Sequence, residues 1–153
     1  EVISYLRFNL RSQIYAKSLP MAMTIGAIKR LEMMKNHPEL RERLWEIANA
    51  LQKGFREAGF DLGRTQSPVT PVFFNGELAQ TTHLIKDLRK NYGIFCSVVI
   101  YPVVPRGVIM LRIIPTAAHT MEDVNYTLQA FKEVKKKLET NVYPTDVMAD
   151  FRN

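Results

Sequence analysis

Arg112 is the side chain whose position in this sequence most directly suggests chemistry. It lies in an apolar run from Val108 to Ile114, with Leu111 and Ile113 on either side. An arginine buried there without a partner would cost a large part of the stability of a domain, so the guanidinium needs an anion. That anion is either a carboxylate of the protein or the carboxylate of a small ligand, and the local sequence leaves both open.

Few other residues offer chemistry. His119, just before the expected helix cap Thr120, is the one histidine near Arg112, and it could either touch a ligand or fix the turn. His83 has no second ligand at useful spacing, and the carboxylates form no acid/base pair, so we expect neither a metal site nor a catalytic residue in this chain. The lone thiol of Cys96 lies in an apolar run, as expected of a buried cysteine in a reduced, cytoplasmic protein.

Length and charge limit the class of protein. The 153 residues are enough for one domain with its own core. The formal net charge is +6, but basic and acidic residues alternate along the predicted helices. No basic patch is interleaved with aromatic side chains, so we expect no nucleic-acid partner. No apolar run is long enough to span a bilayer. The chain starts with glutamate, and we expect it to be part of a longer protein.

The hydrophobic pattern predicts helices and short strands. Helices are expected at 1–10, 21–35, 38–58, 78–92 and 121–138, strands at 69–75, 94–101 and 108–114, and an extended connector at 11–20. The last two strands should pair antiparallel, because the segment between them is too short for a helical crossover. Gly59 and Gly93 are placed to end helices, and Thr120 with Asp123 forms a capping box.

These elements predict an α+β fold with a small, largely antiparallel sheet covered by helices on one face. Leu78, Ile85 and Leu88 should form the inner side of the fourth helix. If the helices lie against the face that carries Leu111, Arg112 points out of the opposite face, which a missing domain would cover. The tail, 139–153, shows no periodicity and is expected to be loose or to pack on a neighbour.

Three segments together resemble the C-terminal part of the α-oxoamine synthases, which are pyridoxal-phosphate (PLP) enzymes of the aspartate-aminotransferase fold. These segments are RSQIYAKSLPMAMTIGAIKRLE, DLGRTQSPVTPV and VVIYPVVPRGVIMLRIIPTAAHT. The family includes aminoketobutyrate CoA ligase, oxononanoate synthase, aminolevulinate synthase and serine palmitoyltransferase. The resemblance implies that 1–35 is the end of a large domain with its connecting helix, that 36–138 is the small domain, and that 139–153 is a tail.

The resemblance also implies a function. The parent protein would be a PLP-dependent transferase that condenses a glycine- or serine-like amino acid with an acyl-CoA and releases the amino acid's carboxylate as CO₂. It would work as a homodimer. The Schiff-base lysine would lie in the missing N-terminal large domain, so this chain alone is expected to be inactive and not to bind PLP covalently. The alternative is a stand-alone anion-binding, small-molecule-binding or interaction module without catalysis.

Site residues follow from the same resemblance. Arg112, which precedes the Thr116–His119 motif, would bind the carboxylate of the amino acid. Ala16 and Lys17 would reach the cofactor phosphate of the partner subunit, Ala16 only through its backbone N–H, although Lys17 could equally be an exposed connector lysine. Ile100 stands where oxononanoate synthases and serine palmitoyltransferases carry an arginine, which favours a small acyl-CoA.

Overall fold

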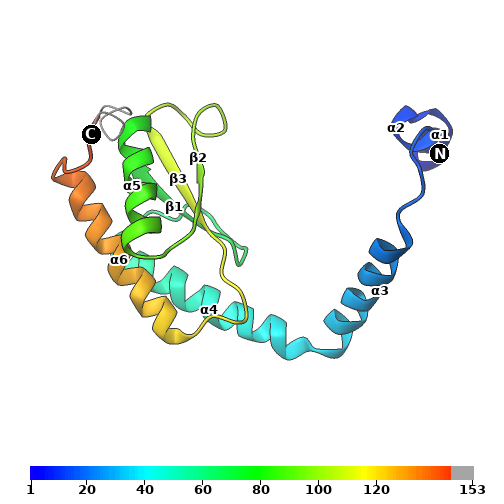
Figure 1. Ribbon diagram of the computed structural model, residues 1–153, viewed down its shortest axis with the longest axis horizontal. Helices are drawn as coiled ribbons and strands as arrows, with labels where there is room; N and C mark the ends of the chain where they lie inside the picture. The colour runs from blue at the N-terminus through cyan, green and yellow to red at the C-terminus, as the bar shows by residue number, and fades with distance from the viewer. Residues whose placement is uncertain (146–153) are drawn as a thin grey trace. The chain divides into compact units, whose positions relative to one another are not determined.

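The computed structural model describes residues 1–145, and its contacts divide the chain into two compact units. Unit 1 is Glu1–Pro38 and unit 2 begins at Glu39. The helices and strands of both units are drawn in Figure 1. The predicted site residues are divided between the units, with Ala16 and Lys17 in unit 1 and Arg112 in unit 2.

Unit 1 consists of three helices without a buried residue. These are α1 (Val2–Asn9), α2 (Arg11–Ile14) and α3 (Met21–Asn36). The prediction of an extended connector at 11–20 is wrong for its first four residues, because the carbonyl of Leu10 accepts the N–H groups of Gln13 and Ile14 and starts a helical turn. The apolar residues that α3 carries at helical spacing are exposed.

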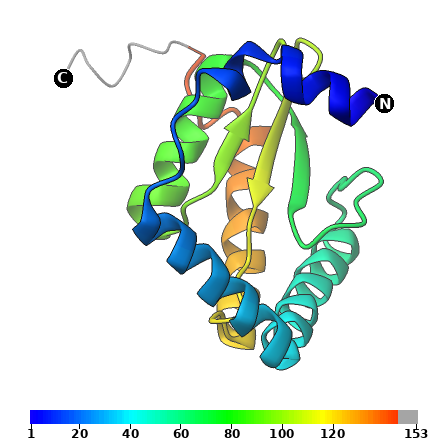
Figure 2. The same cartoon turned by 90° about the vertical axis from the view of Figure 1, so that its right-hand side faces the viewer.

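Within the described residues, unit 2 is a three-stranded antiparallel sheet with three helices. The helices are α4 (Pro38–Glu57), α5 (Leu78–Asn91) and α6 (Met121–Glu139), and the strands are β1 (Thr70–Asn75), β2 (Ser97–Val99) and β3 (Val108–Ile113). The strand order is β1-β3-β2, with β3 in the centre (Figure 2). The predicted α+β fold with one small antiparallel sheet is therefore confirmed.

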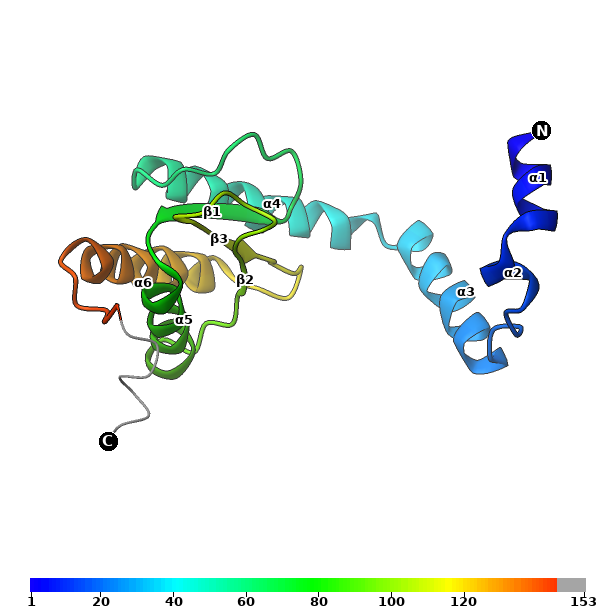
Figure 3. The same ribbon diagram turned by 90° about the horizontal axis from the view of Figure 1, so that it is seen from above.

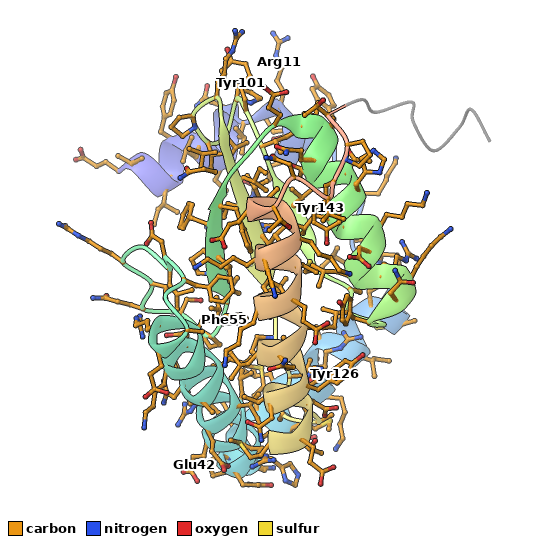
Figure 4. All side chains as sticks on the ribbon, turned by 90° about the vertical axis from the view of Figure 1, so that its left-hand side faces the viewer. Arg11, Glu42, Phe55, Tyr101, Tyr126 and Tyr143 are labelled. Carbon is orange, nitrogen blue, oxygen red and sulfur yellow. The ribbon has the colours of Figure 1, made fainter. Side chains whose placement is uncertain are left out.

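The core lies between the helices and one face of the sheet. Alternate residues of β1 and β3 are buried, as expected for a sheet covered on one side: Val72, Phe74, Ile109, Leu111 and Ile113. The side chain of Phe55, a residue of α4, is fully buried on the side toward α6 (Figure 4). Its ring meets those of Phe60 and Phe131 edge-on, with centroids 5.4 and 5.1 Å away. Such contacts between large rings anchor the helices on the sheet.

The predicted helix ends are largely confirmed. The hydroxyl of Thr120 accepts the N–H of Asp123, and the carboxylate of Asp123 accepts the N–H of Thr120, which is the expected capping box. Gly59 and Gly93 follow α4 and α5 with φ of 73° and 66°, values that favour glycine. Leu78 was expected to face inward, but at the first position of α5 it is 56% exposed.

The strand expected at 94–101 is shorter than predicted. Only Ser97–Val99 pairs with β3. The chain then turns, since the N–H of Val103 donates to the carbonyl of Ile100. At the other end, the side chain of Cys96 is buried in the core, as predicted, and burial raises the pKa of its thiol to about 11. A thiol of such high pKa is inert at neutral pH.

Of the two possibilities left open for the tail, Tyr143 rules out a loose chain at this position, because it packs on α5. It is 6% exposed, and its hydroxyl donates to the carboxylate of Asp87 at 2.6 Å. Lys137 and Asn91 donate to the same carboxylate at 2.8 and 2.6 Å. Burial alone would raise the pKa of Asp87, but these three hydrogen bonds together lower it. The chain after α6 is thus fastened to α5 (Figure 4). Residues 146–153 of the predicted tail lie outside the described residues.

Candidate functional site

Arg112 lies on the central strand, on the face of the sheet that the helices leave uncovered. Its Cα pairs with Pro71 of β1 and Ser97 of β2. Because side chains alternate along a strand, Leu111 and Ile113 enter the core while Arg112 is exposed. The guanidinium is therefore not buried within this chain, since only one face of β3 is covered. The expectation that Arg112 points out of the opposite face is confirmed.

The guanidinium of Arg112 has one hydrogen bond within the described residues. Its Nε–H donates to the hydroxyl of Ser97 at 3.1 Å. No carboxylate in the part of the chain that the structure describes forms an ion pair with it. Of the two anions that the sequence left open, a carboxylate of the protein is thus not found among residues 1–145. The two Nη atoms remain available for a ligand.

A cleft of about 350 Å³ adjoins Arg112. One wall is the uncovered sheet face, which contributes Pro71, Phe73, Met110 and Arg112. The other wall is the segment 62–69, which leads from α4 to β1. Figure 3 shows this segment on the side of the sheet opposite α5 and α6. It brings a second arginine, Arg64, to the same cleft.

The segment that carries Arg64 is tied to β1 by specific contacts. The N–H of Phe73 donates to the carbonyl of Asp61 at 2.9 Å, and the Asp61 carboxylate accepts the N–H of Gly63 at 2.8 Å. Gly63 has a φ of +56°, and a Cβ there would lie 3.2 Å from the Phe73 ring. Glycine therefore allows both the turn and the close approach to the strand.

Sequence reasoning missed Arg64. The Asp61-Leu62-Gly63 pattern predicts a turn, because an aspartate side chain commonly bonds the backbone two residues on. It does not predict on which face of the sheet the next residue lies, which depends on the bridge between Asp61 and Phe73. The position of Arg64 beside the cleft thus depends on tertiary contacts, and no local sequence pattern predicts it.

His119 fixes the turn before α6. Its Nδ1 accepts the N–H of Thr116 at 2.9 Å, with the Thr116 hydroxyl also at 2.9 Å. The carbonyl of His119 accepts a hydrogen bond from Arg43 at 3.3 Å. Of the two roles that the sequence left open for His119, the geometry supports the structural one.

Ala16 and Lys17 are both exposed in unit 1. The N–H of Ala16 donates to the carbonyl of Gln13 at 3.3 Å, a long hydrogen bond. Lys17 forms no ion pair with a carboxylate of the described residues. Lys17 can therefore offer a phosphate its ammonium group. The N–H of Ala16 can bind a phosphate only if its long hydrogen bond to the carbonyl of Gln13 breaks.

Other classes of site receive no support within residues 1–145. No group of three potential metal-ligating side chains occurs there. No helix in this described range is long and apolar enough to cross a membrane.

Sequence comparisons identify the family. The model of the aminotransferase class I and II family matches residues 1–131, and the chain belongs to this family. Within it, the relatives are α-oxoamine synthases. A cysteate-C-fatty acyltransferase of Capnocytophaga ochracea is 54% identical over 94% of this chain and 34% of its own length. An 8-amino-7-oxononanoate synthase of Exiguobacterium sibiricum is 35% identical over 90% of this chain and 35% of its own length.

Solved structures agree with this assignment. Serine palmitoyltransferase of Sphingomonas wittichii superposes with a TM-score of 0.78 at 26% identity, over 93% of this chain and 35% of that chain. A serine palmitoyltransferase solved with PLP gives 0.77 at 26% identity, over 90% and 34%. The chain therefore spans about a third of the length of the relatives that it matches.

Proposed function

We propose that this chain is the C-terminal part of a PLP-dependent acyltransferase that joins an amino acid to a fatty acyl thioester with loss of the amino acid's carboxylate. The observation that carries the proposal is the guanidinium of Arg112, which is exposed on a central strand and has no carboxylate partner among the described residues. The 54% identical relative supports cysteate as the amino acid, in place of the glycine- or serine-like substrate expected from the sequence.

The proposed reaction balances as follows. A bond forms between the α-carbon of the amino acid and the acyl carbon of the thioester, the C–S bond of the thioester breaks, and the bond from the α-carbon to the carboxylate breaks. The carboxylate leaves as CO₂, and CoA leaves as a thiol with the one proton that is taken up overall. The product is an α-amino ketone. PLP, when bound, supplies the electron sink for the bond that breaks at the α-carbon.

In this proposal, Arg112 orients the amino acid. A planar guanidinium can hold a carboxylate through two parallel N–H···O bonds, which fixes its direction as well as its charge. The hydrogen bond from Nε–H to Ser97 directs the side chain and leaves the Nη atoms for the ligand. Because β3 pairs with a strand on either side, the clamp stands on a rigid element.

The cofactor contacts are proposed for unit 1. Lys17 would pair with the phosphate of PLP, and Ala16 would offer its N–H. The Schiff-base lysine would come from the N-terminal large domain of the parent protein, so this chain alone would not turn over. We also propose a homodimer, which the exposed apolar side chains of unit 1 support because such surface tends to be buried by association. The buried thiol of Cys96 supports a cytoplasmic location.

A fatty acyl group replaces the small acyl group expected from Ile100. That expectation rested on a short local pattern around Ile100, whereas the 54% identical relative is a fatty acyltransferase by name. The rival reading, a stand-alone binding module, is opposed by unit 1, since a self-contained module gains nothing from three helices without a buried residue.

The test uses the full-length parent protein with PLP. Release of CoA thiol from palmitoyl-CoA should depend on L-cysteate, and carboxyl-labelled cysteate should release one labelled CO₂ per thiol. Glycine, L-serine and L-alanine, each with palmitoyl-CoA or acetyl-CoA, complete the comparison. Thiol release without CO₂, or release that does not depend on any amino acid, would contradict the proposed function.

A further inference from the structure

We propose that Arg64 binds the second anionic group of the amino acid, the sulfonate on the side chain of cysteate, while Arg112 binds the carboxylate. This inference rests on the proposed function and deepens it, because it assigns a specificity-determining residue. The chemical class of substrate is an α-amino acid whose short side chain ends in a strong acid.

The charge of the cleft carries the inference. Two arginines line the same cleft of about 350 Å³, and no acidic residue among residues 1–145 lines it. Neither arginine forms an ion pair with a carboxylate of the described residues. Two cations beside one open cleft, neither paired with a carboxylate of the described residues, repel each other. A ligand with two anionic groups relieves that repulsion better than one with a single group.

The remaining polar groups of the cleft are largely committed. The hydroxyl of Thr65 donates to the carbonyl of Val69 at 3.1 Å, and the hydroxyl of Ser67 accepts the N–H of Val69 at 3.1 Å. These bonds shape the segment and leave Arg64 as its cationic donor. A sulfonate presents three acceptor oxygens, which suits the fork of N–H donors on a guanidinium.

The backbone holds Arg64 in place at this cleft. It directly follows Gly63, whose positive φ and close approach to the Phe73 ring set the path of the chain. The bridge between Asp61 and Phe73 joins the same segment to β1, the strand next to the one that carries Arg112. Because the two arginines stand on connected elements, their spacing can select a ligand whose two anionic groups have a matching separation.

The experiment compares variants of the full-length, PLP-loaded enzyme. Arg64→Gln removes the charge and keeps a polar side chain of similar reach, Arg64→Lys keeps the charge, and Arg56→Gln removes an exposed arginine of α4 outside the cleft. For each, kcat and KM are measured for L-cysteate and L-serine with the same palmitoyl-CoA. The dissociation constant of L-cysteate is measured without acyl donor by calorimetry.

Arg64→Gln should lower kcat/KM for cysteate by roughly 10- to 100-fold, mainly through KM, as expected for one charge-assisted contact. Its kcat/KM for serine should stay within about threefold of the wild type, because serine has no second anion to lose. Arg64→Lys should retain an intermediate preference for cysteate, and Arg56→Gln should match the wild type.

Two results would overturn the assignment of Arg64. One is an unchanged kcat/KM for cysteate in Arg64→Gln, and the other is an equal loss for cysteate and serine, which would indicate a structural role. If the wild type released no CoA with any amino acid, the proposed function would fail separately. Calorimetry would then still decide on Arg64, since equal affinities of wild type and Arg64→Gln for cysteate would reject its role.

Discussion

Unit 1 and unit 2 are both rich in apolar residues, yet only unit 2 buries them. In α3, Ile25, Ile28 and Leu31 recur at helical spacing and are all exposed. In α4, Ile47, Leu51 and Phe55 have similar spacing and are all buried. An apolar stripe therefore predicts that a helix forms and that one of its faces becomes buried. It does not predict which element or chain buries that face.

A second contrast of the same kind divides unit 2. One face of its sheet packs against α4, α5 and α6, and the other face carries Arg112 beside a cleft. Substitutions on the covered face should change the free energy of unfolding, whereas those on the open face should change ligand binding. This contrast, together with that between the units, can be tested by substitution.

The largest effect is expected from Phe55→Ala. Removing a fully buried ring that touches Phe60 and Phe131 should lower the free energy of unfolding of this chain by about 3–5 kcal/mol. The matched control is Ile25→Ala in α3, measured on the dilute, monomeric chain, where the side chain is exposed and the change should stay within about 0.5 kcal/mol. Urea denaturation followed by circular dichroism measures both. Equal losses in the two variants would remove the distinction between the units.

Arg112→Lys should affect function without affecting the fold. Lysine keeps the charge but cannot form two parallel hydrogen bonds, so kcat/KM for the amino acid should fall by an amount on the order of 2–4 kcal/mol in transition-state terms, with a raised KM. The full-length enzyme is required for the kinetics. The unfolding midpoint of this chain should not change, because the side chain points away from the core. An unchanged kcat/KM would end the carboxylate-clamp role.

Tyr143→Phe tests the hydrogen-bond network around Asp87, which fastens the chain after α6 to α5. The variant loses the 2.6 Å hydrogen bond to Asp87 while keeping the ring, so the free energy of unfolding should fall by about 1.5–3 kcal/mol. Tyr126→Phe is the control, because its hydroxyl donates to the carbonyl of Tyr92 at an exposed position. A loss in Tyr126→Phe as large as that in Tyr143→Phe would show that burial of the network does not matter.

The same network should make stability depend on pH at both ends of the scale. The pKa of Asp87 is lowered in the folded chain from 3.8, so its contribution is present above that value and is lost as the pH falls through the folded pKa. Hydrogen bonding to Asp87 raises the pKa of Lys137 above 10.5, and burial raises the pKa of Tyr143 above 10.0. Their contributions are fully present below these values and are lost as the pH rises through the higher pKa values of the folded chain. The difference in free energy of unfolding between wild type and Asp87→Asn, measured from about pH 3 to pH 11, should be largest near neutral pH and should shrink toward both ends of this range.

The smallest effect is expected at the cap of α6. Thr120→Ala removes the hydroxyl that accepts the N–H of Asp123 and should cost about 1 kcal/mol. Thr120→Ser keeps the hydroxyl and serves as the control. Thermal unfolding resolves the two, and a Thr120→Ala variant as stable as Thr120→Ser would mean that the cap contributes nothing.

The features predictable from sequence were those with a local cause. The capping box at Thr120 and the glycine after α4 depend on residues within a few positions of one another, and the outward direction of Arg112 follows from strand alternation. The features that were missed join distant segments. Tyr143 bonds Asp87 across 56 positions, and Arg64 reaches the cleft only because its segment bridges to β1. No local sequence pattern predicts either contact.

The short β2 and the bridge beside β1 have a consequence for aggregation. Exposed strand edges invite pairing with other chains, and this sheet protects both of its edges. On one side, β2 offers only three residues, too few for a stable added strand. On the other, Phe73 of β1 already gives its N–H to Asp61, and Pro71 has no N–H to give. Neither edge of the sheet can therefore readily pair with a strand of another chain and extend into a fibril. Association of this chain should proceed through helix surfaces instead.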